Sequence, residues 1–250
     1  MQKASSANHT SEQPLRNKVR RVLGPVWTTR LICIVKGLGL PRWGNLRRLK
    51  GFSNCHGCDR GTPVDRYYVD RFFERHSAEI TGDVLEIDQN IYTHRYGHDL
   101  HTVHSVDIDP KSEPTFLCDL AYSENIVPSE SYDAFLLPCT LHHFRELELC
   151  LRNVLRVVKP GGVILATCAG LIRADIEDID FWHPTPAGWR ELLKKAWPDC
   201  EVTVEGEGNC LSAIAFNLGL ALEELKPREL DYNDGLYPVV TNIYCRKPRR

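Results

Sequence analysis

Residues 144–169 constrain the fold of this chain more than any other segment. Their first part, 144–158, has apolar side chains at the i, i+4, i+7, i+8 and i+11 spacing of an amphipathic helix: Leu147, Leu151, Val154, Leu155 and Val158. The sequence Lys-Pro-Gly-Gly at 159–162 stops that helix. The apolar run that follows predicts a strand covered on both faces, so this part of the chain is expected to form layers of helix and sheet.

The rest of the chain beyond residue 63 repeats this alternation. We predict strands at 83–88, 102–109, 115–119, 132–138, 162–169, 201–205 and 239–245. We predict helices at 64–80, 144–158, 185–197 and 210–225, and we interpret 89–93 as a turn. Strands that alternate with helices predict a doubly wound α/β domain with a largely parallel sheet.

The first 50 residues differ from the remainder in charge. They contain eleven Lys or Arg and one acidic residue, Glu12, for a net charge of +10, whereas the other 200 carry 20 basic and 32 acidic residues, or −12. We therefore divide the chain into a partly disordered basic arm, 1–50, and a domain, 51–250. Apolar and basic residues from 15 to 49 predict basic amphipathic helices interrupted at Gly24-Pro25. These helices would dock on a membrane surface or a partner, or pack on their own domain.

Compartment and partners follow from composition. The apolar stretches are too short to span a bilayer, and residues 1–21 lack the apolar core of a secretory signal, so we expect a cytoplasmic protein, peripheral at the membrane if the arm binds there. The acidic body excludes nucleic acid as the expected partner.

The ten cysteines are expected to be reduced, because most lie in apolar segments. Cys55-x-x-Cys58 has no second pair to complete a four-ligand zinc site, so these two are interpreted as loop thiols. No metal-ligand set is recognised, and we predict metal independence.

Acidic and polar residues follow the predicted strands. Glu86 and Asp88 end the first strand, Asp109 the second, and Asp119-Leu120 the third, while 139–143 follows the fourth. In an open α/β sheet, ligands bind outside the carboxyl ends of the strands. A carboxylate at Asp109 is placed to accept hydrogen bonds from both hydroxyls of a ribose.

Taken together, these segments resemble the class I S-adenosylmethionine (SAM)-dependent methyltransferases. The matching motifs are VLEID, VDIDP, CDL, YDAFLLPCTLHHF and LRNVLRVVKPGGVILAT. The segments RGTPVDRYYVDRFFERH, EIDQNIYTHRYG and GNCLSAIAFNLGLALEEL are similar to the methyltransferase-type-11-like proteins associated with bacterial glycosyltransferases. The resemblance covers about residues 52–246 and implies a Rossmann-like seven-stranded sheet, mostly parallel with the last strand antiparallel, and helices on both faces.

The resemblance also implies the cofactor SAM and a set of residues that bind it. Glu86 and the turn from Asp88 to Tyr92, including Asn90, would face the methionine and ribose, and Asp109 the ribose hydroxyls. Asp119 and Leu120 would face the adenine. Residues Cys139, Thr140 and His142 would lie under the sulfonium. The chain departs from the family at Asp88, where the narrower group tends to have glycine.

Three further groups of residues complete the candidate site. Arg60 and Gly61 precede a helix and would supply a cation and an amide to the cofactor carboxylate, or only cap the helix. His142 and His183 are candidate catalytic bases for a hydroxyl acceptor, or surface histidines, with His143 a weaker candidate. Residues Arg173, Asp175, Asp178, Asp180 and Trp182 are candidate acceptor contacts.

The function expected is therefore O-methylation of a small hydroxyl acceptor, a sugar or glycan. The alternative is a catalytically weak or inactive methyltransferase-like module that serves a glycosyltransferase, which Asp88 and the missing glycines favour. A nicotinamide-dependent oxidoreductase would need G-x-G-x-x-G after the first strand, and the chain lacks it there.

Overall fold

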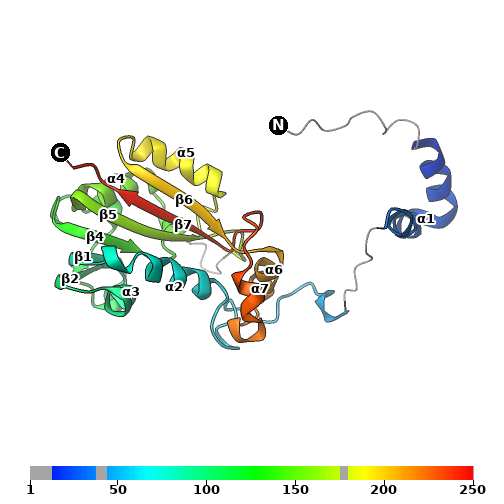
Figure 1. Cartoon of the computed structure of the whole chain (residues 1–250), viewed down its shortest axis with the longest axis horizontal. Coiled ribbons are helices and arrows are strands. Elements are labelled where there is room, and N and C mark those ends of the chain that lie inside the picture. Colours follow the sequence, from blue (N-terminus) through cyan, green and yellow to red (C-terminus); the bar gives the residue numbers. More distant parts are fainter. Residues whose placement is uncertain (1–12, 38–43, 175–179, 250) are drawn as a thin grey trace. The chain divides into compact units, whose positions relative to one another are not determined.

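A computed structural model describes residues 13–37, 44–174 and 180–249 of the chain (Figure 1). The chain divides into two compact units, Met1–Leu49 and Lys50–Arg250. The first unit contains helix α1, Gln13–Val35, in which Gly24 adopts φ 75° and ψ 165° and Pro25 follows. This confirms the predicted interruption at Gly24-Pro25. In the described parts of the chain, no helix has the length and apolarity that a bilayer span requires.

The second unit is built on one sheet of seven strands in the order β3-β2-β1-β4-β5-β7-β6. The strands are β1 Gly82–Ile87, β2 Leu100–Asp107, β3 Phe116–Leu117, β4 Tyr132–Leu137, β5 Val158–Ala169, β6 Glu201–Glu207 and β7 Val240–Arg246. Neighbours pair in parallel from β3 to β5, and β7 lies antiparallel between β5 and β6. The predicted doubly wound sheet with an antiparallel last strand is confirmed.

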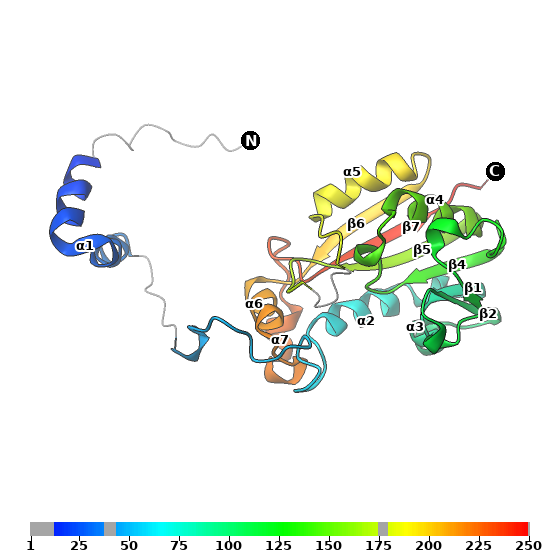
Figure 2. The same cartoon turned by 180° about the vertical axis from the view of Figure 1, so that it is seen from behind.

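Helices cover both faces of this sheet (Figure 2). They are α2 Asp65–Arg75, α3 Ile91–Tyr96, α4 Leu147–Val157, α5 Pro186–Ala196, α6 Cys210–Leu218 and α7 Pro227–Asp231. Alternate residues of β4 show the two layers: Phe135 and Leu137 belong to the apolar cluster that includes α4 and α5. Ala134 and Leu136 belong to the cluster that includes α2, α6 and α7.

Several boundaries differ from the sequence-based expectation. The helix predicted over 64–80 ends at Arg75, and the strand predicted from 162 begins at Val158. Three other differences have a local reason. The segment interpreted as a turn is the start of α3, whose first amide groups are bound by a buried carboxylate described below. The helix predicted over 210–225 ends at Leu218, because Gly219 adopts the left-handed conformation, φ 70°, and closes it. Strand β2 ends at Asp107, not Asp109, because the Asp107 side chain accepts a hydrogen bond from the Asp109 amide and turns the chain.

Candidate functional site

Two adjoining cavities lie at the carboxyl-end edge of the sheet. The larger has a volume of about 660 Å³ and is lined by the ends of β1, β2 and β4 together with α2 and α3. The smaller, of about 300 Å³, is lined by residues of 55–66, 139–143 and 169–180 and by Phe216. Arg66, Cys139 and His143 line both. We call them the first and the second cavity; both volumes are of the size that binds small ligands.

The floor of the first cavity depends on Glu86. Its buried carboxylate accepts hydrogen bonds from the backbone amides of Tyr92 (3.0 Å) and Thr93 (2.7 Å). These amides belong to the first turn of α3, where a helix leaves its N–H groups without partners of its own. Burial raises the pKa of Glu86. Glu86 therefore holds the β1–α3 turn against the sheet.

The turn itself adopts glycine-like conformations without containing glycine. Asp88 has φ 69° and Asn90 φ 57°, both in the left-handed region. Asp and Asn tolerate this region better than other side chains because they are short and polar. Asp88 lines the first cavity; burial and then the carboxylates of Asp107 and Asp109 raise its pKa. Asp88 thus takes a conformation that suits glycine, the residue expected at this position, and it adds negative charge to the cavity.

At the end of β2, Asp107 lines the first cavity and Asp109 does not. Asp107 accepts hydrogen bonds from the Asp109 amide and from the Ser112 hydroxyl, both at 2.9 Å. Each of its oxygens keeps a free lone pair for a ligand. Asp109 is exposed and caps the following turn through the Lys111 amide. The geometry therefore places Asp107 where the sequence suggested Asp109, because the strand ends two residues earlier than expected.

Several other predicted cofactor residues lie away from the first cavity. Arg60 pairs with Glu224 instead, and Gly61 lies against the side chain of Glu223. Asp119 caps a short turn through the Ala121 amide, and Leu120 is buried in the core. Asn90 is absent from the lining, although it shapes the turn. The predicted residues that do line this cavity are Glu86, Asp88, Tyr92, Cys139 and Thr140.

Two arginines that residue spacing did not indicate bring positive charge to the first cavity. Arg66 of α2 lies 3.6 Å from the Cys139 sulfur, and Arg95 of α3 pairs with Asp70 at 2.7 Å. Both line the cavity. Arg66 is the second residue of α2, and only the packing of α2 over the sheet brings it to the cavity. Two guanidinium groups in one cavity are suited to a carboxylate ligand.

Cys139 forms the wall between the two cavities. It adopts φ 47°, its amide donates to the Thr167 hydroxyl at 2.8 Å, and burial raises the pKa of its thiol to about 11. The thiol is therefore neutral near pH 7, and the wall beneath both cavities is apolar at this point.

Asp65 is another site residue that residue spacing did not indicate. It is 7% exposed, lines the second cavity, and burial raises the pKa of its carboxyl. Its Oδ1 atom has no hydrogen-bond partner among the described residues. A buried carboxylate oxygen without a partner costs free energy unless a ligand donates a hydrogen bond to it.

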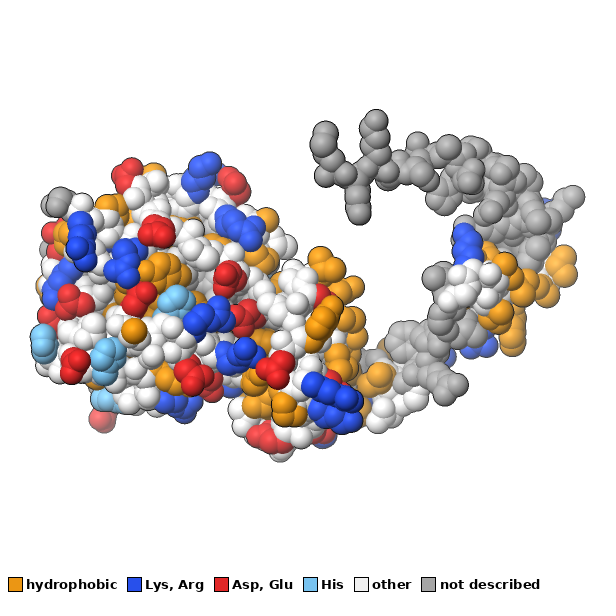
Figure 3. Space-filling model, viewed as in Figure 1, with side chains coloured by type: hydrophobic (Ala, Val, Ile, Leu, Met, Phe, Trp, Pro, Cys, Tyr) orange, Lys and Arg blue, Asp and Glu red, His pale blue; other side chains and the backbone are white. Residues whose placement is uncertain are grey.

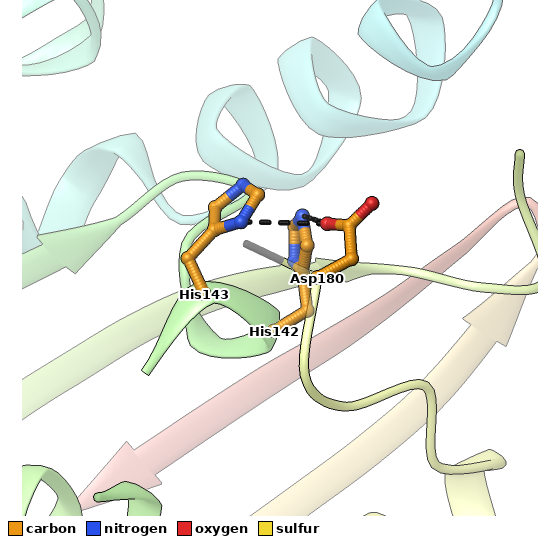
Figure 4. A group of neighbouring side chains, drawn as sticks. All are labelled: His142, His143 and Asp180. Carbon is orange, nitrogen blue, oxygen red and sulfur yellow. Dashed lines mark ion pairs between the residues drawn. The ribbon is translucent and has the colours of Figure 1, made fainter. Parts of the chain in front are cut away.

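Two histidines of the second cavity's lining lie beside a carboxylate of the same lining (Figure 4). His142 Nε2 lies 3.7 Å and His143 Nδ1 3.4 Å from Asp180 Oδ1. Burial, followed by the neighbouring His143 and His183, lowers the pKa of His142 to about 3, which makes it a weak base. His183 lines neither cavity, although its ring stacks near that of His142.

Of the acceptor contacts suggested by sequence, only Asp180 lines the second cavity. Arg173 donates to the Asn54 carbonyl and Trp182 to the Phe144 carbonyl. Asp175 and Asp178 lie outside the described residues. Cys55 and Cys58 do line this cavity, and hydrogen bonding from Cys58 lowers the pKa of Cys55.

Comparison with known proteins agrees with this architecture. Residues 89–166 match the family model described as a methyltransferase domain. No curated protein matches the sequence. The family match supports a methyltransferase domain within residues 89–166, and the solved structures below support the fold.

Solved structures show the same fold at low sequence identity. A SAM-dependent methyltransferase from Archaeoglobus fulgidus is 15% identical with a TM-score of 0.50, over 73% of this chain and 94% of that one. One from Mesorhizobium loti is 15% identical with a TM-score of 0.50, over 76% and 100%. Phosphoethanolamine N-methyltransferase 2 of Haemonchus contortus, in complex with SAM, is 14% identical with a TM-score of 0.50, over 94% and 60%.

The first cavity fits SAM by the chemistry of its lining. Arg66 and Arg95 suit the carboxylate of the methionine part, and Asp107 suits the ribose hydroxyls. Asp88 adds a negative charge that favours the cationic parts of the molecule. The side chain of Ile108 lines the cavity next to Asp107 and offers an apolar surface to an adenine ring.

Proposed function

We propose that this protein methylates a hydroxyl group of a small polyol, a sugar or the end of a glycan, with SAM as the donor. The observation that carries the proposal is the unpartnered Oδ1 atom of buried Asp65 in the second cavity. A hydroxyl group is a hydrogen-bond donor that would satisfy this oxygen. The cavity volume of about 300 Å³ suits an acceptor of monosaccharide size.

Asp65 is also the candidate general base. SAM supplies a methyl group that is bonded to a cationic sulfur. When the acceptor oxygen attacks the methyl carbon in line, the carbon–sulfur bond breaks and the sulfur keeps its electrons. Asp65 accepts the hydroxyl proton, and burial, which raises its pKa, makes it a stronger base than an exposed aspartate. Arg66 and Cys139 line both cavities, so the acceptor and the methyl group would meet at this wall.

The first test is binding. Calorimetric titration of the full chain with SAM and S-adenosylhomocysteine should show saturable binding of both, with NAD and ATP as controls that do not bind. If neither adenosyl compound binds at millimolar concentration, the alternative of an inactive module that serves a glycosyltransferase is favoured instead.

The second test is turnover. Formation of S-adenosylhomocysteine from SAM should depend on an added sugar or nucleotide sugar from a panel of hydroxyl acceptors. Asp65→Asn should lower kcat by roughly 10²- to 10⁴-fold, the usual contribution of a general base, and leave SAM affinity unchanged. Glu74→Ala, on the exposed side of the same helix, is the matched control. Full activity of Asp65→Asn would remove Asp65 from the mechanism.

We also propose that the arm, residues 15–50, binds an anionic membrane surface. Basic and apolar side chains lie side by side on the described part of α1 (Figure 3). Val22, Val26 and Trp27 are exposed, and the Arg30 guanidinium lies 5.2 Å from the Trp27 ring. This combination favours the boundary between lipid headgroups and acyl chains.

Vesicle sedimentation tests this proposal. The full chain should sediment with vesicles that contain anionic lipid and not with zwitterionic vesicles, whereas residues 50–250 alone should bind neither. Equal sedimentation of both proteins would contradict membrane binding by the arm, and binding to neither vesicle would favour a protein partner such as a glycosyltransferase.

A further inference from the structure

Three ligand-type atoms converge on the wall of the second cavity. They are His142 Nε2, His143 Nδ1 and a carboxylate oxygen of Asp180, and all lie within 4.8 Å of one another. Figure 4 shows both imidazole rings directed at the carboxylate. These residues come from the turn after β4 and from the loop after β5, so the fold alone brings them together.

Two of the three separations between these atoms are close to those around a bound metal ion. Metal–nitrogen and metal–oxygen distances of about 2.0–2.1 Å place two ligands of a tetrahedral ion roughly 3.3 Å apart. The distances from Asp180 to His143 and His142 are 3.4 and 3.7 Å. Small rotations of the side chains therefore suffice to bring these atoms into a coordination sphere.

The supporting structure holds these residues in place. The backbone amides of Phe181 (2.8 Å) and Trp182 (3.3 Å) donate to the His142 carbonyl, which ties the loop of Asp180 to the turn that carries the histidines. The other ring nitrogen of His142 lies 3.6 Å from the Cys168 sulfur. An outer partner on the second ring nitrogen is the usual arrangement for a histidine that binds metal.

We propose that His142, His143 and Asp180 bind one divalent first-row transition-metal ion, with zinc as the representative ion. Two imidazoles and one carboxylate suit such ions better than magnesium or calcium. All three residues line the second cavity, which leaves a coordination position open toward an incoming ligand, as in catalytic zinc sites. The separation of Asp180 from the histidines in sequence explains why residue spacing gave no sign of this site.

The ion would hold an oxygen atom of the acceptor. Asp65 lies on the lining of the same cavity, so a polyol could present one hydroxyl to Asp65 and a neighbouring oxygen to the ion. This role rests on the proposed function, whereas metal binding does not.

The test measures metal binding by the full chain without SAM or acceptor. Titration with Zn²⁺, after removal of metal by a chelator, should show one saturable site, and Co²⁺ should give the visible absorption of nitrogen and oxygen coordination. His143→Ala and Asp180→Asn should each weaken Zn²⁺ binding at least tenfold, because loss of even an outer partner costs about 10- to 100-fold. Mg²⁺ should not compete.

Two matched variants show whether the site is the proposed one. His183→Asn removes a neighbouring histidine outside the cluster, and Cys55→Ser removes a thiol that lines the same cavity. Both should bind Zn²⁺ as the unmodified chain does. The proposal is overturned if no saturable site exists, if His143→Ala and Asp180→Asn bind normally while folded by circular dichroism, or if Cys55→Ser abolishes binding.

Discussion

The two cavities share a wall but are built in different ways. The first lies over the ends of three neighbouring strands, β1, β2 and β4, and its charged groups are held by short local hydrogen bonds such as those of Glu86 and Asp107. The second brings together loops from three distant parts of the sequence. Its polar groups include a carboxylate oxygen without a partner and two histidines beside a carboxylate.

The difference indicates that the first cavity holds a ligand in a fixed position and that the second is the place where chemistry occurs. In the first cavity the carboxylates of Glu86 and Asp107 accept hydrogen bonds from backbone amides, so their positions are set before a ligand binds. In the second, Asp65 is kept in a costly environment that a ligand would relieve. Strained or unsatisfied groups of this kind are typical of sites where chemistry occurs.

The largest effect should come from Glu86→Ala, which removes the support of the first cavity. The amides of Tyr92 and Thr93 would lose their buried acceptor, and two unsatisfied amides cost about 2–4 kcal/mol of unfolding free energy together. Urea denaturation measures the loss. Glu74→Ala, exposed on α2, should change stability by less than about 0.5 kcal/mol. Equal effects of the two substitutions would mean that Glu86 does not support α3.

The next largest effect is expected from Asp107→Ala, which should weaken the binding of SAM. Loss of the ribose contact is expected to weaken SAM binding roughly 10- to 100-fold, or about 1.4–2.8 kcal/mol, by calorimetric titration. Asp109→Ala, two residues away and outside the cavity, should change the affinity less than about threefold, or about 0.7 kcal/mol. If Asp109→Ala weakened SAM binding more than Asp107→Ala, Asp109 would be the ribose ligand, as the sequence predicted.

Asp65→Asn should stabilise the protein by roughly 1 kcal/mol near neutral pH, although it lowers activity. The raised pKa means that the folded state binds more protons than the unfolded state between the two pKa values. Stability of the unmodified protein therefore falls as pH rises above the ordinary range of an aspartate, and the advantage of the variant should shrink on acidification. Denaturation at pH 7 and pH 4 tests this, and a variant less stable at both would show that Asp65 is satisfied.

The smallest effect concerns the turn after β1. Asp88 has a φ of 69°, a conformation that only glycine adopts without steric cost. The free energy of unfolding of Asp88→Ala should therefore be lower than that of Asp88→Gly by about 1 kcal/mol. Thermal unfolding of both variants measures the difference. A more stable alanine variant would mean that Asp88 does not adopt the left-handed conformation in solution.

Much of the sheet could be predicted because burial on both faces leaves a local pattern. The apolar runs of β4 and β5 and the helix between them were recognisable from residue spacing alone, as was the break at Gly24-Pro25. Strand ends were less predictable, since Asp107 and Asp109 lie on the same face of an extended chain and only a side-chain hydrogen bond decides where β2 stops.

The candidate site was predicted in part. Glu86, Asp88, Tyr92, Cys139 and Thr140 line the first cavity as expected, because parallel strands bring their ends to one edge. Arg60 lies outside this lining and pairs with Glu224, a residue far from it in the sequence, so residue spacing could not indicate its partner. Asp65 carries no sequence signal beyond an acidic residue at a helix start, which is common in any helix.

The amino-acid sequence by itself determined the succession of the seven strands and four of the helices, the basic arm and the acidic strand ends, because periodicity and charge are local properties. Only the tertiary structure decided which carboxylate faces a ligand, that Asp65 is buried with an unsatisfied oxygen, and that His142 and His143 meet Asp180. Burial and distance depend on how separate segments pack, and residue spacing along the chain contains no measure of either.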